Sequence, residues 1–418
     1  MNRSTLTLTR RDVCAMLGAT ATIGLGSRAW AQAPTRQADR QTDQALPGIT
    51  LPRTMVWTAY PTGTTGYAQA VGVGSVLRSL YNVSVRVLPG RNDVGRLEPV
   101  RLGRADLAFG GTEVITVQEA QRDFGVRDWG PQPMRMILVN RADACSFAIQ
   151  VPRDSDIRHP RDLRGRRVPY VLGAAAPNAG FEFYLRYANL TWNDVQRVEI
   201  GGYMAMIEAF IDGRLDAKWN ACHSAVLHRV ANSPRGFRFL EFPHADREAT
   251  ARVSAEAPWF QPHVARNTVG IDVGERGVEV FSSPYPIMAS LPTLRADYVY
   301  SLVKVMDRHH NMYRAAAPGM EGWQVDRQAE IENSFMPFHD GAIRYFREIG
   351  LWTPSAQRNH ERRLERQRVL QRAWEEYTRA APSDTDAFQT GWMAARHDAL
   401  VRAGQEPLSR TWPLARGA

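Results

Sequence analysis

The chain has 418 residues, of which 44% are hydrophobic and 23% charged, and its formal net charge at pH 7 is +9. This length and apolar content are enough for two lobes with cores of ordinary size. The positive charge comes mainly from arginines spread along the chain, not from a basic stripe with interleaved aromatics, which argues against a nucleic-acid-binding protein.

The first 31 residues have the features of an export signal. A twin arginine, Arg10-Arg11, precedes a mildly apolar run at 14–25, and Ala29-Trp30-Ala31 has a small-x-small cleavage pattern. These features predict a twin-arginine signal peptide over 1–31, with an ordinary secretory signal as the alternative. We therefore expect a periplasmic protein cleaved near Ala31, in which the polar residues 32–52 form a flexible leader.

The cysteines and the short motifs favour a protein without redox or metal chemistry. Cys145 and Cys222 are the two cysteines outside the predicted signal, and two free buried thiols are favoured over one bridge. The sequence contains no CxxC, HExxH, GxSxG or haem-attachment pattern, and no Ser/His/Asp set stands out. We therefore expect no cofactor, no metal and no enzymatic activity.

Three units of similar construction follow one another near the start of the predicted mature chain. Each has a short apolar run, a turn of small polar residues and a helix-like pattern. The expected strands are 54–58, 84–88 and 106–109, and the expected helices are 67–80, 93–102 and 113–121. Tandem strand–turn–helix units imply a parallel sheet, and open α/β sheets bind ligands along the carboxyl ends of their strands. Helix starts rich in Gly and Thr suit an anion such as a carboxylate.

The rest of the chain repeats this pattern and then becomes helical. A strand at 167–172 precedes a helix expected at 179–188, and a strand-like run at 215–220 ends at polar residues. Strand-like pieces at 268–271 and 286–289 indicate a return of the chain. The sequence thus divides into lobe 1 (53–148), lobe 2 (149–264), a return to lobe 1 (265–352) and a helical extension (353–418) with helices at 355–380 and 386–403.

Several short segments, weak individually, resemble a known family in their order and spacing. They are Gly66-Tyr67, Arg86-Val87-Leu88-Pro89-Gly90, Val94-Gly95-Arg96-Leu97, Gly103-Arg104-Ala105-Asp106, Gly111-Thr112-Glu113, Trp129-Gly130-Pro131-Gln132 and Asp212-Gly213-Arg214-Leu215-Asp216-Ala217. Together they resemble the TAXI family, the extracytoplasmic solute receptors of tripartite ATP-independent periplasmic (TRAP) transporters. The resemblance covers about residues 53–352. The chain departs from many relatives at 62–66, where their turn is richer in Gly, and at 175–178, where they have Gly-Ser-Gly-Thr.

The resemblance implies a type II periplasmic-binding-protein fold, with α/β lobes on either side of a ligand cleft. It also implies capture of a small carboxylate or amino-acid-like solute by a monomeric receptor, which delivers that solute to a TRAP-type membrane permease. An exported sensor subunit, an ABC-type receptor and a twin-arginine-exported enzyme are the alternatives.

Candidate ligand-binding residues follow the strands of both lobes. They are Tyr60, Thr62, Thr64, Thr65 and Gly66 after the first strand, Arg91 and Asn92 after the second, Thr112 and Glu113 after the third, and Asn178, Asn220 and His223 in lobe 2, with Tyr285 near the returning strand. Hydroxyls and free N–H groups could bind a carboxylate, Arg can bind one bidentately, and amides donate and accept. The alternatives are helix capping for the threonines, an exposed loop for Arg91 and a helix-start charge for Glu113.

Overall fold

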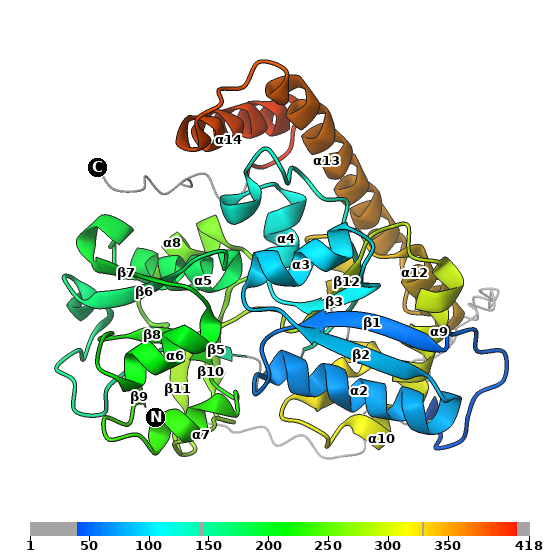
Figure 1. The fold of residues 1–418 in the computed structure, drawn as a ribbon, viewed down its shortest axis with the longest axis horizontal. Coiled ribbons are helices and arrows are strands. Elements are labelled where there is room, and N and C mark those ends of the chain that lie inside the picture. The colour runs from blue at the N-terminus through cyan, green and yellow to red at the C-terminus, as the bar shows by residue number, and fades with distance from the viewer. Residues whose placement is uncertain (1–39, 142–145, 328–329, 408–418) are drawn as a thin grey trace, which may run out of the picture. The chain divides into compact units, whose positions relative to one another are not determined.

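The computed structural model describes residues 40–141, 146–327 and 330–407 (Figure 1). The predicted signal peptide, its cleavage site, the start of the leader and Cys145 lie outside the described residues. Cys222 is buried. No helix in the described ranges is long and apolar enough to cross a membrane.

Lobe 1 is built on one mixed sheet with the strand order β2-β1-β3-β12-β4 within the described residues. Its strands are β1 (Thr54–Ala59), β2 (Ser84–Pro89), β3 (Leu107–Gly110), β4 (Arg135–Val139) and β12 (Ile287–Ser290). The pairs β1–β2 and β1–β3 are parallel, as predicted, whereas β12 runs antiparallel to both β3 and β4. The central strand β3 is buried along its whole length, which explains its unbroken apolar sequence.

Helices connect and cover the strands of lobe 1. They are α2 (Thr65–Tyr81), α3 (Asp93–Arg101), α4 (Glu113–Gln118), α9 (Ala296–Arg308), α10 (His310–Tyr313), α11 (Glu330–Asn333) and α12 (Asp340–Glu348), with short 3-10 turns η1 (Arg122–Phe124), η4 (Met320–Trp323) and η5 (Val325–Arg327). The expected helices at 67–80 and 93–102 are confirmed within two residues. The third ends early because Ala120 and Arg122 both have positive φ angles, 48° and 57°.

Lobe 2 contains a mixed sheet and a separate parallel pair. The first has the order β10-β11-β5-β8, with β9 also paired to β5, and the second is β6-β7. The strands are β5 (Ser146–Val151), β6 (Arg167–Val171), β7 (Gln196–Ile200), β8 (Lys218–Ala221), β9 (Arg238–Phe239), β10 (Gln261–Ala265) and β11 (Val278–Ser282). The helices are α5 (Ala175–Tyr187), α6 (Tyr203–Ile211), α7 (Val226–Ala231) and α8 (Arg247–Glu256), with 3-10 turns η2 (Pro160–Leu163) and η3 (Trp192–Asp194).

The chain passes between the lobes twice, from β4 to β5 and back from β11 to β12. Two α/β lobes joined by such crossings form the type II periplasmic-binding-protein fold, as predicted. Tyr184 of α5 bonds to the two lobe 2 strands next to the crossings. Its hydroxyl donates to the Phe147 carbonyl of β5 and accepts from the Phe281 amide of β11. Because β10 and β11 both belong to the lobe 2 sheet, the return to lobe 1 comes with β12, later than the expected position 265.

Two local predictions in lobe 2 were wrong. Helix α5 begins at Ala175 instead of 179, because Pro177 lies in its first turn, where its ring and missing N–H are tolerated. The segment 268–271 is an irregular bend, not a strand. Gly270 has a φ angle of 87°, and the Thr268 hydroxyl donates to the Ile271 carbonyl at 2.7 Å.

The expected flexible leader is instead anchored from its first described residue. Arg40 pairs with Asp307 at 2.8 Å, and the Thr42 amide donates to the Arg308 carbonyl at 2.8 Å. The Leu46 amide donates to the Tyr81 hydroxyl at 2.9 Å. These contacts hold residues 40–46 against lobe 1. The polar composition of this segment therefore does not make it flexible.

The C-terminal extension consists of α13 (Pro354–Thr378) and α14 (Thr385–Arg402), which pack on each other and confirm the predicted helical pair (Figure 1). Their shared apolar core includes Trp374, Phe388 and Trp392, and it also takes in Ala120 of lobe 1. The Trp392 indole donates to the Ala120 carbonyl at 2.8 Å. The extension therefore packs on the irregular turn that follows α4.

Candidate functional site

A cavity is lined by residues of both lobes. Lobe 1 contributes Tyr60, Gly111 and Thr112, at the carboxyl ends of β1 and β3. The remaining lining comes from α5, α6, β5, β8 and the segments after α8 and before β12. Aromatic side chains supply eight of the fourteen lining residues: Tyr60, Phe147, Phe183, Tyr203, Trp219, Trp259, Phe260 and Tyr285.

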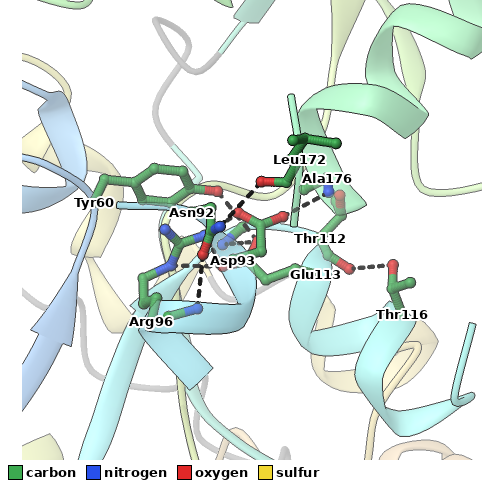
Figure 2. Close-up of polar contacts among 11 residues, drawn as sticks. Tyr60, Asn92, Asp93, Arg96, Thr112, Glu113, Thr116, Leu172 and Ala176 are labelled. Atoms are coloured by element: carbon green, nitrogen blue, oxygen red, sulfur yellow. Dashed lines mark hydrogen bonds and ion pairs between the residues drawn. The ribbon is translucent and has the colours of Figure 1, made fainter. Parts of the chain in front are cut away.

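A buried ion cluster lies directly behind Tyr60 (Figure 2). The guanidinium carbon of Arg96 lies 3.5 Å from the centre of the Tyr60 ring, a cation–π contact. Arg96 donates from Nε and Nη2 to Glu113 Oε1, at 2.9 and 2.6 Å, and from Nη2 to Asp93 Oδ1 at 2.5 Å. The Tyr60 hydroxyl donates to Glu113 Oε2 at 3.2 Å, so these four side chains form one network.

The charges of this cluster are unbalanced, because one arginine faces two carboxylates. Burial, followed by repulsion from Glu113, raises the pKa of Asp93 to about 7, although Arg96 opposes the shift. Burial works against the charged form of Arg96, but the carboxylates of Glu113 and Asp93 raise its pKa above the ordinary value. The raised pKa of Asp93 means that the cluster can take up a proton near neutral pH.

The start of α3 forms hydrogen bonds that cross from lobe 1 to lobe 2 (Figure 2). Asp93 Oδ2 accepts from the Ala176 amide at 2.7 Å, and Asn92 Nδ2 donates to the Leu172 carbonyl at 3.0 Å. The Val94 amide donates to the Gly173 carbonyl at 3.1 Å. A Cβ at Gly173 would lie 2.5 Å from Asn92 Nδ2, and its φ angle is 70°, so only glycine permits this approach.

The threonines after β1 do not line the cavity, and one of them caps helix α2. Thr64 caps α2, because its hydroxyl accepts from the Tyr67 amide at 3.5 Å and donates to the Pro61 carbonyl at 2.7 Å. Thr62 is exposed, and Thr65 is buried with no hydrogen-bond partner for its hydroxyl among the described residues. The Gly66 amide donates to the Tyr285 hydroxyl at 3.3 Å, which places this amide beside a cavity residue.

The residues predicted after β2 and β3 are mostly engaged within the protein. Arg91 is exposed and packs on lobe 2, where a Cβ at Gly201 would lie 2.7 Å from its Nη2. Asn92 also caps α3, accepting from the Gly95 amide at 2.8 Å. Thr112 lines the cavity, whereas Glu113 is held by Arg96 and by the Gly111 amide at 2.7 Å.

The predicted lobe 2 residues lie near one another but have different surroundings. The Asn178 side chain forms two hydrogen bonds with the backbone of Val171: it accepts from the amide at 2.9 Å and donates to the carbonyl at 2.8 Å. Asn220 Oδ1 accepts from the hydroxyl of the cavity residue Tyr203, and its Nδ2 is buried without a partner in the described chain. The His223 ring lies 6.5 Å from that of Tyr285. None of the three lines the cavity.

Sequence reasoning missed Arg96, Asp93 and most of the aromatic wall. The Asp93/Arg96 spacing at a helix start after a strand is an i,i+3 charge pair, a detectable signal. Trp219 stacks on Phe147 with ring centres 4.7 Å apart, but these residues come from β8 and β5, 72 positions apart in sequence. Their meeting depends on strand pairing, for which the sequence carried no local signal.

The described residues contain no group of three or more His, Cys, Asp or Glu side chains that could hold a metal ion.

The profile of the NMT1-like family matches residues 58–350, well over half of the chain. No curated protein matches the sequence significantly.

Solved structures with related topology include three solute-binding proteins. The aliphatic sulphonate binding protein SsuA from Escherichia coli is 14% identical with a TM-score of 0.37, covering 88% of this chain and 94% of that one. PhnD1 from Prochlorococcus marinus, in complex with methylphosphonate, is 11% identical with a TM-score of 0.44, covering 72% and 99%. An ancestral arginine-binding protein bound to arginine is 13% identical with a TM-score of 0.40, covering 66% and 99%. Likeness at this level says nothing about the ligand of the present chain.

Proposed function

Because the chain belongs to the NMT1-like family of the periplasmic-binding-protein superfamily, we propose that it is a periplasmic receptor that captures a small organic solute between its lobes. The observation that carries the proposal is the cavity, whose walls come from both lobes at the carboxyl ends of β1 and β3. Open α/β sheets bind their ligands at this edge.

The contacts between the lobes suggest how capture works. A solute that touches both walls favours the arrangement in which Asp93, Asn92 and Val94 bond to lobe 2. Differential affinity for this arrangement is what shifts its population, and a membrane partner can recognise the shifted form. A micromolar dissociation constant corresponds to roughly −8 kcal/mol, which a few hydrogen bonds and the burial of apolar surface can supply.

The solute and the partner are named from the family resemblance. It suggests a small carboxylate or amino-acid-like solute, and a TRAP-type permease that receives it. Transport into membrane vesicles that contain the permease, dependent on added receptor, tests this partner. If an ABC-type permease or a sensor kinase responds to the loaded receptor instead, that protein is the partner and the TRAP-type permease is not.

Binding can be tested with the mature protein by thermal shift and by native mass spectrometry of co-purified solute. A ligand specific for the native state raises the melting temperature in proportion to its occupancy. We expect Ser283→Phe, which fills the cavity, to abolish the shift, whereas Ser79→Phe on the exposed face of α2 preserves it. An undiminished shift in Ser283→Phe would place binding elsewhere.

A further inference from the structure

We infer that the solute is uncharged, with an aromatic body and hydrogen-bond acceptors, as in aromatic amides. This inference rests on the proposed function and refines the solute class for the same cavity. It differs from the small carboxylate that the family resemblance suggests. Three properties of the lining carry it: the balance of charge, the available donors and the aromatic surface.

The cavity offers no positive charge to an anion. None of the fourteen lining residues is Lys, Arg, His, Asp or Glu. Arg96, the cation behind Tyr60, already faces two carboxylates, so the nearest buried cluster adds no net positive charge. One Arg96 nitrogen, Nη1, lacks an acceptor in the described chain, but Arg96 does not line the cavity. A carboxylate without a compensating cation would lose its hydration on entering this site.

Other basic residues near the cavity do not change this balance. Lys218 alternates with the lining residues Trp219 and Ala221 along β8, and its ammonium donates to Gln150 Oε1 at 2.7 Å. Alternation along a strand directs this side chain to the opposite face of the sheet. Arg91 is exposed and packs on Gly201 and Gly202.

Two donors in the lining have no acceptor. The indole nitrogens of Trp219 and Trp259 are buried, each residue being only 8% exposed, and neither has a hydrogen-bond partner among the described residues. An indole N–H can only donate, and buried donors in native proteins nearly always find an acceptor. A neutral carbonyl or ring nitrogen on the solute would satisfy them without bringing in a charge.

The rest of the lining is suited to an aromatic body. Eight aromatic side chains surround the cavity. Aromatic rings gain from edge and offset contacts beyond the area they bury. A cationic ligand could also contact these faces, but it would leave both indole donors unsatisfied.

Matched pairs of probes that differ in charge test the inference. Binding of benzamide and nicotinamide is compared with that of benzoate and nicotinate by calorimetry on the mature protein, with glutamate and choline as further probes. We expect at least one amide to bind ten-fold or more tightly than its carboxylate counterpart, and glutamate and choline not to bind. The inference is overturned if neither amide binds, or if a carboxylate, glutamate or choline binds more tightly.

Variants of the two tryptophans show whether binding uses the lining. Trp259→Phe and Trp219→Phe keep an aromatic ring but remove the N–H, and we expect each to weaken amide binding about five-fold, the effect of one hydrogen bond. Trp129→Phe, whose ring contacts Arg101 away from the cavity, is the matched control. Equal affinities in all of these proteins would contradict the role of the indoles.

The same experiments separate the inference from the proposed function. An aliphatic acid that co-purifies and is displaced in Ser283→Phe would refute the neutral aromatic solute while leaving the receptor function intact. If no probe binds and no solute co-purifies, both are refuted.

Discussion

Two buried ion clusters in this protein have opposite compositions. Beside the cavity, Arg96 faces the carboxylates of Asp93 and Glu113. Where the extension joins lobe 1, Glu119 instead faces Arg366, at 2.6 Å from Nε to Oε1, and Arg396, at 2.5 Å from Nη2 to Oε2. Both clusters are almost fully removed from solvent, so the difference between them is one of stoichiometry.

The stoichiometry decides which cluster responds to pH. Burial would raise the pKa of Glu119, but Arg366 and Arg396 outweigh it and lower that pKa to about 2. At the cavity, burial and the second carboxylate outweigh the single arginine and raise the pKa of Asp93 to about 7. A lone carboxylate between two arginines thus stays ionised, whereas the surplus carboxylate beside one arginine titrates near neutrality.

The largest effect is expected from breaking the extension cluster. Glu119→Ala removes the carboxylate that Arg366 and Arg396 both contact, and we expect it to lower the free energy of unfolding by about 3–5 kcal/mol, because buried arginine cannot shed its proton. Urea unfolding monitored by circular dichroism measures this loss. Glu98→Gln, which removes a partly exposed partner of Arg101, should change stability by less than about 1 kcal/mol. Similar values for the two variants would contradict the burial argument.

Breaking the cavity cluster should have a smaller effect that depends on pH. Arg96→Met leaves Asp93 and Glu113 side by side, but carboxylates can escape the penalty by taking up protons. We expect a loss of about 2–4 kcal/mol at pH 8 and a clearly smaller loss at pH 5, measured by urea unfolding at both values. A loss that does not change with pH would mean that neither carboxylate titrates in this range.

Asp93→Asn tests whether Asp93 itself makes the stability of the cavity cluster depend on pH. Between pH 3.8 and about 7 the folded protein holds a proton on Asp93 that the unfolded chain has released, so the contribution of this residue to stability falls as pH rises through that window. We expect the variant to remove a slope of at most about 1.4 kcal/mol per pH unit while still accepting from the Ala176 amide. Burial also lowers the pKa of Lys218 to about 7, so the difference between variant and wild type at each pH isolates Asp93. A constant difference would rule out titration of Asp93.

The ion pair between Arg122 and Glu182, with Arg186 4.0 Å from the same carboxylate, gives the smallest expected effect. Arg122 and Glu182 lie 3.0 Å apart and connect η1 of lobe 1 with α5 of lobe 2, and Glu182 also accepts from the Trp192 indole. Glu182→Gln keeps an oxygen acceptor for both donors, so we expect a loss of only about 1 kcal/mol. A loss as large as that of Glu119→Ala would show that the balance of charge does not set the order.

Local patterns were sufficient to predict the frame of this protein. Apolar runs followed by Gly- and Thr-rich turns predicted β1, β2 and β3 and their parallel pairing, and helical periodicity predicted α13 and α14. The return through β12 was also predicted, from the short strand-like piece at 286–289. The fold was therefore largely accessible from signals of short range.

The lining of the site was less accessible, for a physical reason. Thr64 and Asn92 look like ligand residues in sequence, but the same oxygen atoms cap α2 and α3. The aromatic wall and the partners of Arg96 come together only when strands and helices far apart in sequence pack. Which polar atoms remain unsatisfied depends on that packing, and a single sequence does not reveal it.

The hydrogen bonds of Tyr184 have a mechanical consequence. One phenol oxygen bonds α5 to β5 and β11, the lobe 2 strands next to the two crossings, and so holds the helix against both strands. The same helix presents its first turn to Asp93 at the opposite end. A proton gained or lost on Asp93 would therefore act on a helix whose other end is hydrogen-bonded to the strands next to both crossings.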